Sequence, residues 1–342
     1  MTRPLRGSER PLVDCHDAFF FDLDGVLYVG PDAVPGAAEA LAALHVRRCP
    51  VAYVTNNASR TPDTVAAHLT RLGIAAEARE VVTSAQAVAA LLADQLPEGA
   101  PVLVIGGEGL HRAVEDCGLR PVEGAADRPA AVVQGFGPEV GWRALAEGTY
   151  AVAAGVPWYV TNLDATVPTA HGTAPGNGAL VDVIAGASGR RPHVVAGKPE
   201  RPLFDAAVAR TGASRPLMVG DRLDTDIAFA NRGGADSLLV LTGVTRLGEL
   251  LGAPAPLRPT HVAERLTDGL FVPVPAVTAD GDSWRCGGWR CAVRDGQPAL
   301  AGAGTRVDAF RVLCAAAWER SLDIDEGAVA ELEATVRAST EA

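Results

Sequence analysis

In the stretch Ala18-Phe19-Phe20-Phe21-Asp22-Leu23-Asp24-Gly25, four apolar residues run directly into two acids and a glycine. An apolar run that ends at a glycine is typical of a buried β-strand. Because side chains alternate along a strand, Asp22 and Asp24 point the same way from its carboxyl end. At about 5 Å and an effective dielectric constant near 20, their repulsion costs about 3 kcal/mol. A hard cation such as Mg²⁺ would offset this repulsion, while an ordinary Asp-Gly turn is the alternative that the stretch alone leaves open.

The overall composition indicates a water-soluble globular protein. The chain has 342 residues, of which 48% are hydrophobic and 21% charged, enough for a large core and two or three domains. Its formal net charge of -11 argues against nucleic acid or an anionic membrane as a partner. No apolar run approaches the roughly 20 residues of a membrane span, and residues 1–16 lack the apolar core of a signal peptide. We therefore expect a cytoplasmic protein.

No CxxC pair occurs among the six cysteines, which are Cys15, Cys49, Cys117, Cys286, Cys291 and Cys314. Cys286 and Cys291 are the closest two, and no second pair completes a zinc-site spacing. The pattern favours buried free thiols in a reducing cytosol.

A second strand is expected to bring polar groups to the edge where the two aspartates lie. Helical periodicity at 37–46 precedes an apolar strand at 51–54, and with the first strand these make a βαβ unit with parallel strands. The residues that follow are Thr55, Asn56 and Asn57. Because ligands bind at the carboxyl ends of parallel strands, we expect the Thr55 hydroxyl and the Asn56 amide beside the aspartates, suited to an oxyanion.

Residues 88–192 have the pattern of a separate α/β module. Strands are expected at 102–105, 130–134 and 158–161, with a helix at 142–154. Asn162 and Asp164 follow the last of these strands, and a polar loop at 168–178 contains His171. Loops of this kind frequently carry specificity, so Asp164 and His171 are candidates for contact with a substrate. Plain turn chemistry is the alternative.

Lys198 is the only lysine among the 30 basic residues of the chain. It ends an apolar strand that begins at Val194, with which the chain is expected to return to the core. A lysine retained in so arginine-rich a chain is expected to be needed for its compact ammonium, which a planar guanidinium does not imitate. A chance surface lysine is the alternative.

Another apolar strand, at 216–220, runs into Asp221, and Asp224 and Asp226 then open a helix. Acids in a first helical turn are explained by the helix dipole. Asp221 lies earlier, at the strand tip, and is the candidate for a third metal carboxylate. Further core elements are expected as a strand at 237–241 and as residues 259–262 followed by a helix at 263–266.

Four strand-tip motifs occur in a fixed order: Asp22-Leu23-Asp24-Gly25-Val26, Thr55-Asn56, Lys198, and Gly220-Asp221 through Asp226. This ordered set resembles the haloacid dehalogenase-like (HAD) phosphatases. About 140 residues separate the second motif from the third, which is similar to the branch of NagD, 4-nitrophenylphosphatase and phosphoglycolate phosphatase, with an inserted type-2 cap. Thr161-Asn162-x-Asp164 and Pro175-Gly176-x-Gly178-Ala179 also look like that branch. The resemblance covers roughly residues 17–270.

The resemblance implies an α/β fold with three parts. A Rossmann-like three-layer core with a parallel sheet would take residues 1–87 and 193–272, and an α/β cap domain would take residues 88–192. Residues 273–342 lie outside the pattern and are expected to form a small α+β appendage, a hairpin with two helices, that docks on the core or cap. Its tryptophans, Trp284, Trp289 and Trp318, are either packing anchors or contacts.

The resemblance also implies roles for the acids. Asp22 would attack phosphorus to form an aspartyl-phosphate, and Asp24 would act as general acid and then general base. Mg²⁺ would be held by Asp22, the backbone carbonyl of Asp24, and Asp221, while Asp226 would support Lys198.

Phosphate and substrate contacts follow in the same way. Lys198 would neutralise the transferring phosphoryl group, with Thr55, Asn56 and Asn57 on the phosphate side. Asn162, Asp164 and His171 are the substrate-side candidates in the cap.

The implied activity is Mg²⁺-dependent hydrolysis of a small phosphate monoester, with no nucleic-acid or membrane partner. The appendage is similar to that of actinobacterial glycerol 3-phosphate phosphatases, which favours glycerol 3-phosphate. 2-Phosphoglycolate, a nucleotide or pyridoxal phosphate stay open as substrates, as does a catalytically silent ligand-binding regulatory protein. A homodimer is also left open.

Overall fold

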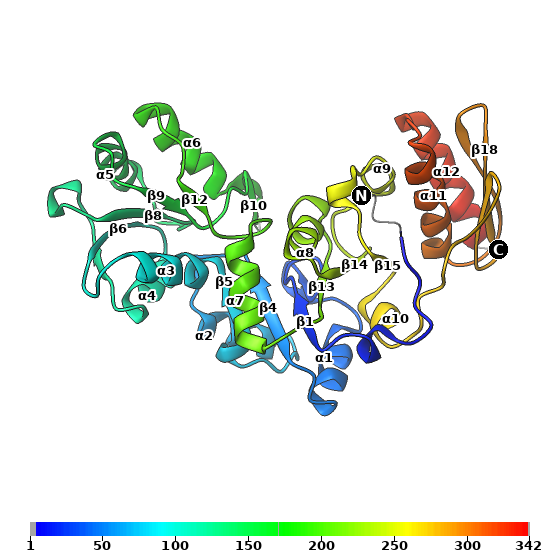
Figure 1. The fold of residues 1–342 in the computed structure, drawn as a ribbon, viewed down its shortest axis with the longest axis horizontal. Helices are drawn as coiled ribbons and strands as arrows, with labels where there is room; N and C mark the ends of the chain where they lie inside the picture. Colours follow the sequence, from blue (N-terminus) through cyan, green and yellow to red (C-terminus); the bar gives the residue numbers. More distant parts are fainter. Residues whose placement is uncertain (1–4, 170, 341–342) are drawn as a thin grey trace. The chain divides into compact units, whose positions relative to one another are not determined.

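The computed structural model describes residues 5–169 and 171–340 (Figure 1). The chain divides into two compact units. One unit joins the part of the chain up to Val51 to the part from Ala213 onward, and the other runs from Ala52 to Gly212. Each unit contains parallel strands and an apolar core of its own, so the α/β class predicted from the sequence is confirmed.

In the first unit, four parallel strands lie in the order β15-β14-β13-β1 (Figure 1). Their bounds are Ala18–Phe21 for β1, Pro216–Gly220 for β13, Asp236–Val240 for β14 and His261–Ala263 for β15. Every residue of β1 is buried, as its apolar sequence predicts. Phe21 pairs with Val219, and the Asp22 amide donates to the Val219 carbonyl at 2.9 Å. Asp22 and Asp221 therefore leave the same edge of the sheet.

Four helices of this unit flank these strands in the chain, namely α1 (Ala37–Val46), α8 (Ala228–Gly233), α9 (Leu247–Leu251) and α10 (Leu266–Leu270). Two of them, α8 and α9, connect β13 to β14 and β14 to β15. The bounds of α1 agree with the sequence, whereas α9 was not expected. The predicted helix at 263–266 is wrong, because Ala263 pairs with Val240 as the last residue of β15 and the helix begins only at Leu266.

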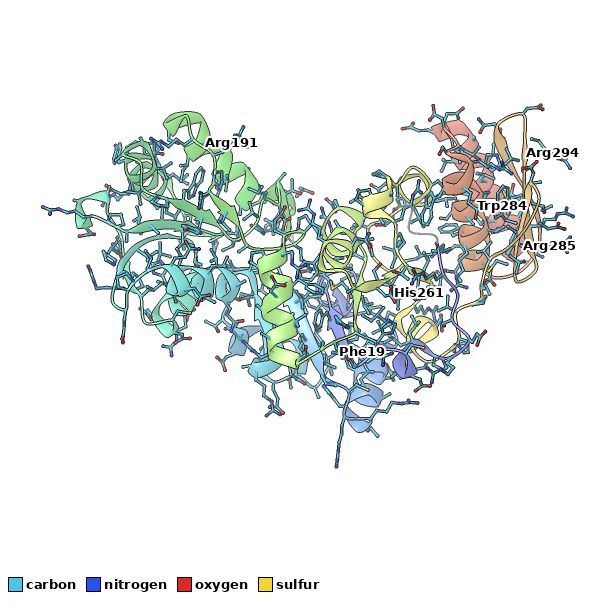
Figure 2. All side chains as sticks on the ribbon, in the orientation of Figure 1. Phe19, Arg191, His261, Trp284, Arg285 and Arg294 are labelled. Atoms are coloured by element: carbon cyan, nitrogen blue, oxygen red, sulfur yellow. The ribbon has the colours of Figure 1, made fainter. Side chains whose placement is uncertain are left out.

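The C-terminal appendage belongs to the first unit and is larger than one hairpin. An antiparallel sheet of β16 (Thr278–Asp280), β17 (Ser283–Cys286), β18 (Trp289–Arg294) and β19 (Gln297–Gly302) precedes α11 (Arg306–Arg320) and α12 (Glu326–Thr340). The predicted Asp295-Gly296 turn joins β18 to β19, with φ values of 49° and 75°. In Figure 2, Trp284 lies on the face of this sheet that α11 covers, and Arg285 lies on the other face.

The tryptophans of the appendage are packing anchors. Trp284 and Trp289 are 1% exposed and Trp318 is 5% exposed, and all three share one apolar cluster with Leu250 and Val262 of the core strands and helices. The Trp318 indole N–H donates to the Leu250 carbonyl at 3.1 Å. The appendage thus docks on the core side, as one of the two expected arrangements.

The second unit contains two sets of parallel strands. β4 (Val51–Thr55) pairs with β5 (Val81–Thr83). A five-stranded sheet has the order β12-β9-β8-β6-β7, with bounds Pro101–Ile105 for β6, Arg120–Val122 for β7, Ala131–Gln134 for β8, Trp158–Val160 for β9 and Val194–Val195 for β12. The helices are α2 (Pro62–Arg71), α3 (Ser84–Gln95), α4 (Glu108–Asp116), α5 (Trp142–Ala153), α6 (Asn177–Ser188) and α7 (Arg201–Thr211).

Two expectations about this unit are wrong. The stretch predicted as a loop at 168–178 is mostly an antiparallel hairpin of β10 (Thr166–Thr169) and β11 (Gly172–Pro175), followed by α6; Ala170 lies outside the described residues. The strand that begins at Val194 was expected to return to the core, but β12 pairs with β9 of the five-stranded sheet. Both differences arise from pairings that local sequence does not specify.

Two general expectations can also be checked. All six cysteines are free thiols, as predicted, but only Cys286, Cys291 and Cys314 are buried, and the other three are half-buried. Among the described residues, no helix is both long enough and apolar enough to cross a bilayer; residues 1–4, part of the stretch searched for a signal peptide, lie outside the described residues.

Candidate active site

Three carboxylates converge at the strand tips of the first unit. Asp22 follows β1, Asp221 follows β13, and Asp226 lies in a π-helical turn at Leu223–Ile227. One oxygen from each carboxylate lies within 4.8 Å of the others. Asp221 is 2% exposed and Asp226 is fully buried, so two of these charges lie in a poorly solvated place. Gathering three like charges there favours a divalent cation with oxygen ligands.

Asp226 is held by the backbone of the strand tip. Its Oδ2 accepts hydrogen bonds from the amides of Asp221 at 3.2 Å and Arg222 at 3.1 Å. A Cβ atom at Gly220 would overlap the Asp226 side chain, so the close approach requires glycine. Asp226 thus braces the strand tip at Asp221, and its predicted role of supporting Lys198 stays a prediction.

Asp224 is separate from this cluster. Arg222 donates to both of its carboxylate oxygens, at 3.1 and 2.8 Å. Burial works to raise the pKa of the Asp224 carboxyl, but the hydrogen bonds and charge of Arg222 hold that pKa below its ordinary value. Asp224 is therefore paired with Arg222. This agrees with the prediction that it is a structural residue at the start of a helix and not a metal ligand.

The loop after β14 encloses Asp221, which the sequence analysis missed. The Val244 amide donates to Asp221 Oδ2 at 2.8 Å, and the Thr245 hydroxyl donates to the Asp221 carbonyl at 2.6 Å. Cβ atoms at Gly243 and at Gly25, whose φ is +82°, would overlap the Asp221 carboxylate. The sequence signal for this loop is Thr242-Gly243, which follows β14 at the edge of the sheet where Asp221 lies.

Asp24 lies on a tight turn beyond β1 and is exposed. The Leu23 carbonyl accepts the Leu27 amide at 2.9 Å, and the Gly25 amide donates to the Tyr28 carbonyl at 2.8 Å. The buried Tyr28 hydroxyl donates to Asp24 Oδ2 at 3.4 Å. Among the described residues, the three-carboxylate cluster does not include the Asp24 side chain. Its carboxylate therefore lies apart from the clustered acids.

In the second unit, Lys198 is held on three sides. It is 3% exposed, and its ammonium donates to the Val54 carbonyl at 3.1 Å. Its amide donates to Asn56 Oδ1 at 2.7 Å, and its carbonyl accepts from Asn56 Nδ2 at 3.1 Å. A Cβ atom at position 197 would overlap Asn56 Oδ1, so the hydrogen bond between Asn56 and Lys198 requires glycine before the lysine. The chance surface lysine is excluded.

The Asn56 side-chain amide hydrogen-bonds to two residues of the second unit. Besides Lys198, its Nδ2 donates to Asp164 Oδ2 at 3.1 Å. Asparagine has two side-chain N–H donors, and both are used in these contacts. The role of this amide toward a phosphate oxygen stays a prediction.

The other predicted phosphate-side residues form a local turn. Thr55 is 5% exposed, and its hydroxyl accepts the Asn57 amide at 3.0 Å. Asn57 Oδ1 accepts both the amide and the hydroxyl of Ser59 at 2.9 Å.

The predicted cap residues fall in two places. Asn162 Nδ2 donates to Asp164 Oδ2 at 2.8 Å and to the Asn56 carbonyl at 3.2 Å. His171 is exposed on the β10–β11 hairpin, where its amide donates to the Thr169 hydroxyl. The structure therefore brings Asn162 and Asp164 to the lysine and places His171 on a hairpin.

Sequence reasoning also missed Asn177, at the start of α6. It is 1% exposed, and its Nδ2 donates to the Asn162 carbonyl at 2.8 Å. The available signal is an asparagine directly after Pro175-Gly176, at the first position of a helix.

Three family models match this chain. "Haloacid dehalogenase-like hydrolase" covers residues 19–120, and a second HAD-hydrolase-like model covers residues 195–269. Residues 286–340 of the appendage match a GCN5-related N-acetyltransferase like domain.

Relatives and solved structures agree with the hydrolase models. The chain is 47% identical to D-glycerol 3-phosphate phosphatase of Mycobacterium tuberculosis over 251 residues, 73% of this chain and 70% of the relative. It is 36% identical to acid sugar phosphatase of Staphylococcus aureus over 257 residues, 75% of this chain and 97% of the relative.

Two solved structures illustrate the likeness in fold. Glycerol phosphate phosphatase from Mycobacterium tuberculosis, in complex with magnesium, superposes with a TM-score of 0.85 at 40% identity, covering 95% of this chain and 98% of that one. NagD from Escherichia coli K-12 gives a TM-score of 0.66 at 30% identity, covering 73% of this chain and 96% of that one. The first likeness therefore extends beyond the two hydrolase models into the appendage.

Proposed function

This chain belongs to the haloacid dehalogenase-like hydrolase family, and on that premise we propose that it is a Mg²⁺-dependent phosphomonoesterase acting on glycerol 3-phosphate. The observation that carries the proposal is the meeting of the Asp22, Asp221 and Asp226 carboxylates within 4.8 Å. Such a cluster at the carboxyl edge of a parallel sheet suits a phosphate ester, whose negative charge needs a cation nearby.

The acid cluster fits magnesium. Its donors are all hard oxygens, and the side chains are held by backbone amides and by close-packed glycines. Asp22 and Asp221 would hold the ion with their carboxylates, and Asp24 with its backbone carbonyl. When bound, Mg²⁺ supplies positive charge that offsets the charge on the transferring phosphoryl group.

Asp22 and Asp24, the two acids of the first motif, carry out the covalent steps of the proposed reaction. An Asp22 carboxylate oxygen attacks phosphorus, the phosphorus–oxygen bond to the alcohol breaks, and the Asp24 carboxyl gives its proton to the leaving oxygen. Water then attacks the same phosphorus and gives its proton to the Asp24 carboxylate. Phosphate leaves, and both acids return to their starting states. The exposed position of Asp24, outside the cluster, supports this division of labour.

Lys198 and Thr55 serve the phosphoryl group in this proposal. The Lys198 ammonium supplies positive charge, and its burial and fixed main chain support a precise position. The Thr55 hydroxyl donates to a phosphoryl oxygen. Asp226 steadies the Asp221 strand tip through two backbone amides.

Glycerol 3-phosphate is proposed because a relative with 47% identity is named for it, and because the likeness to a glycerol phosphate phosphatase structure includes the appendage. We place the enzyme in the cytoplasm, in agreement with six free thiols, and treat a homodimer as a further proposal. For the domains we propose a core of residues 1–87 and 193–272, a cap of residues 88–192 and an appendage of residues 273–342. The pairing of β12 with β9 favours moving the end of the cap beyond Val195.

The test is phosphate release by the purified full chain. The panel contains both enantiomers of glycerol 3-phosphate, 2-phosphoglycolate, a sugar phosphate, a nucleoside monophosphate, pyridoxal phosphate and 4-nitrophenyl phosphate, each with Mg²⁺ and with chelator. We expect the highest kcat/KM for one enantiomer of glycerol 3-phosphate, and loss of turnover with chelator. If another ester has the highest kcat/KM, glycerol 3-phosphate is not the substrate and that ester takes its place in the proposal. Absence of turnover on the whole panel would leave a silent ligand-binding protein.

A further inference from the structure

Asp164 follows β9 and stands two residues beyond Asn162. We propose that the Asp164 carboxylate is a positioning group that fixes Lys198 through the Asn56 amide, and is not a substrate ligand. The proposal rests on the proposed function only for the task given to Lys198. The contacts that carry it lie within the second unit.

The first step is the grip of Asn56 on the main chain of Lys198. Asn56 Oδ1 accepts the Lys198 amide at 2.7 Å, and Asn56 Nδ2 donates to the Lys198 carbonyl at 3.1 Å. One side-chain amide thus binds the donor and the acceptor of a single residue, as a neighbouring strand would. Because the ammonium reaches only as far as its main chain allows, this grip sets where Nζ lies.

The second step is the orientation of the Asn56 amide. Turned by 180°, the amide would set Nδ2 against the Lys198 N–H, donor against donor, and the grip would be lost. The second N–H of Nδ2 donates to Asp164 Oδ2 at 3.1 Å. In the turned amide, Oδ1 would instead face this carboxylate, acceptor against acceptor. A charged acceptor forms a stronger hydrogen bond than a neutral one, so Asp164 selects the orientation that holds the lysine.

The third step is the fixing of Asp164 itself. Asn162 Nδ2 donates to the same Oδ2 at 2.8 Å, and Asn177 Nδ2 in turn donates to the Asn162 carbonyl at 2.8 Å. The Gly178 amide donates to the Asp164 carbonyl at 2.9 Å. A Cβ atom at Gly176 or Gly178 would overlap the backbone of residues 163–166, so these glycines allow the close approach. The carboxylate is therefore preorganised with one oxygen turned to the two asparagine amides.

A substrate ligand and a positioning group predict different kinetics. A ligand of the glycerol part would matter for glycerol 3-phosphate and little for 4-nitrophenyl phosphate, which has no glycerol. A group that positions the phosphoryl-binding lysine matters equally for both esters, and acts on kcat more than on KM.

The kinetic test compares Asp164→Ala with the parent chain on both esters. Because misplacement of a catalytic group by about 1 Å costs about 100-fold, we expect kcat to fall by about 10- to 100-fold on both esters, with KM little changed. Asp164→Asn keeps one acceptor oxygen and should recover part of the loss. Asp182→Ala is the matched control, since this exposed acid pairs with Arg191 on the surface, and it should behave like the parent. A loss confined to glycerol 3-phosphate would overturn the proposal.

A second readout needs no turnover. Because the chain has one lysine, ¹⁵N-lysine labelling with a lysine-free tag gives a single backbone amide signal. This amide donates the 2.7 Å bond to Asn56, so in Asp164→Ala and Asn56→Ala its proton signal should move upfield and exchange faster with solvent. An unchanged signal in Asp164→Ala would refute the proposal even if activity falls. If no ester is hydrolysed, the proposed function fails, and this signal still decides whether Asp164 positions Lys198.

Discussion

Two groups of charged side chains in the first unit are built in opposite ways. At the strand tips, Asp22, Asp221 and Asp226 bring three carboxylates of the same sign within 4.8 Å. In the appendage, Asp308 accepts a 2.7 Å ion pair from Arg311, and both side chains are buried. Opposite charges in contact offset much of the cost of burying them, whereas like charges add a repulsion that a bound cation would offset. Both groups contain buried charges. The candidate active site differs in that its charges have the same sign, whereas those of the appendage are opposite.

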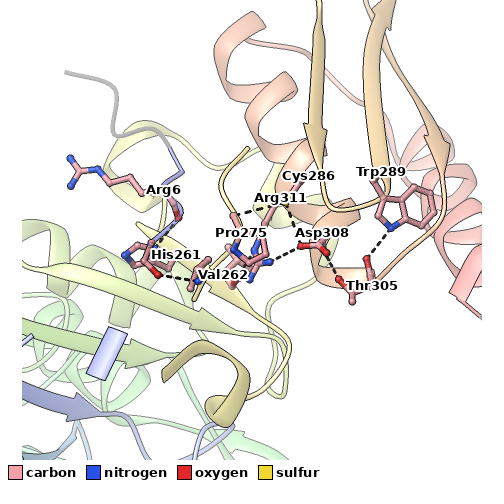
Figure 3. Close-up of polar contacts among 11 residues, drawn as sticks. Arg6, His261, Val262, Pro275, Cys286, Trp289, Thr305, Asp308 and Arg311 are labelled. Carbon is pink, nitrogen blue, oxygen red and sulfur yellow. Dashed lines mark hydrogen bonds and ion pairs between the residues drawn. The ribbon is translucent and has the colours of Figure 1, made fainter. Parts of the chain in front are cut away.

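The appendage pair illustrates the structural case (Figure 3). Arg311 donates from Nε and Nη2 to the Val262 carbonyl of β15, at 3.1 and 2.6 Å. Cys286 lies against Asp308 Oδ1 at 3.4 Å, and burial together with that negative charge raises the pKa of the thiol to about 12. The thiol stays protonated and donates to the carboxylate. These contacts join the appendage to the core sheet.

The largest effect is expected for Asp22→Asn. Losing the nucleophile should lower kcat on 4-nitrophenyl phosphate by about 10⁴-fold or more. Because one of three like charges is removed, the Tm without Mg²⁺ should be equal to or above that of the parent. Steady-state phosphate release and thermal melting measure the two results. Substantial turnover by clean protein would contradict the nucleophile assignment, and a lower Tm would contradict the repulsion.

Lys198→Arg is expected to lower kcat by about 100-fold although the charge is kept, because a planar guanidinium does not match a site built for an ammonium. The ammonium is buried against the Val54 carbonyl, which leaves little room for a larger group. Arg191→Lys, at an exposed position, is the control and should be neutral. Near-normal kcat in Lys198→Arg would show that position 198 needs only a positive charge.

Arg311→Met breaks the neutral pair and leaves Asp308 buried without its cation. We expect the free energy of unfolding to fall by about 3 kcal/mol, with kcat per folded molecule unchanged. The double variant Arg311→Met with Asp308→Leu should recover most of the loss, since no charge then remains buried. Denaturant unfolding measures both. A double variant as unstable as the single one would show that the pair is more than structural charge.

His261 extends the comparison to a buried side chain that is neutral at pH 7. Its Nδ1–H donates to the Arg6 carbonyl at 2.9 Å, and burial lowers its pKa from 6.5 to about 4 (Figure 3). The unfolded chain therefore binds more protons between these values, so stability is fully present above about pH 6.5 and declines toward pH 4. The loss should amount to about 3 kcal/mol, and it should be smaller in His261→Gln. Equal pH profiles of unfolding would contradict this account.

The smallest effect concerns Gln134, an uncharged buried group. Its side chain is fully buried at the end of β8, and neither amide atom has a hydrogen-bond partner among the described residues. Gln134→Met should therefore raise the free energy of unfolding by about 1 kcal/mol. Val133→Ala in the same strand is the contrasting control and should destabilise. Destabilisation by Gln134→Met would show that the amide is satisfied in solution.

The sequence predicted what is local. The apolar run before Asp22 and the periodicity of α1 each need only neighbouring residues, and both features are found in the structure. The choice of β9 as the partner of β12 depends on pairing across the sheet, as does the hairpin at Thr166–Pro175. No local pattern specifies such pairings.

In the candidate site, too, the residues that could be predicted are those that depend only on their neighbours in the sequence. Asp22 and Asp221 could be identified because each follows an apolar strand. The task of Asn56 could not, because its partners Asp164 and Lys198 lie 108 and 142 residues away in the chain. Side-chain amides serve equally well as ligands and as supports, so only the partners decide between the two.

The proposed function depends above all on phosphoryl transfer through Asp22 in the like-charged cluster. The most direct test is to mix the enzyme with Mg²⁺ and glycerol 3-phosphate, quench in acid within a turnover, and reduce with borohydride, which converts an aspartyl-phosphate to homoserine. Peptide mass spectrometry then locates the change. We predict homoserine at position 22 and nowhere else, and none in the absence of substrate. Turnover without any modified residue, or modification at another acid, would contradict the account.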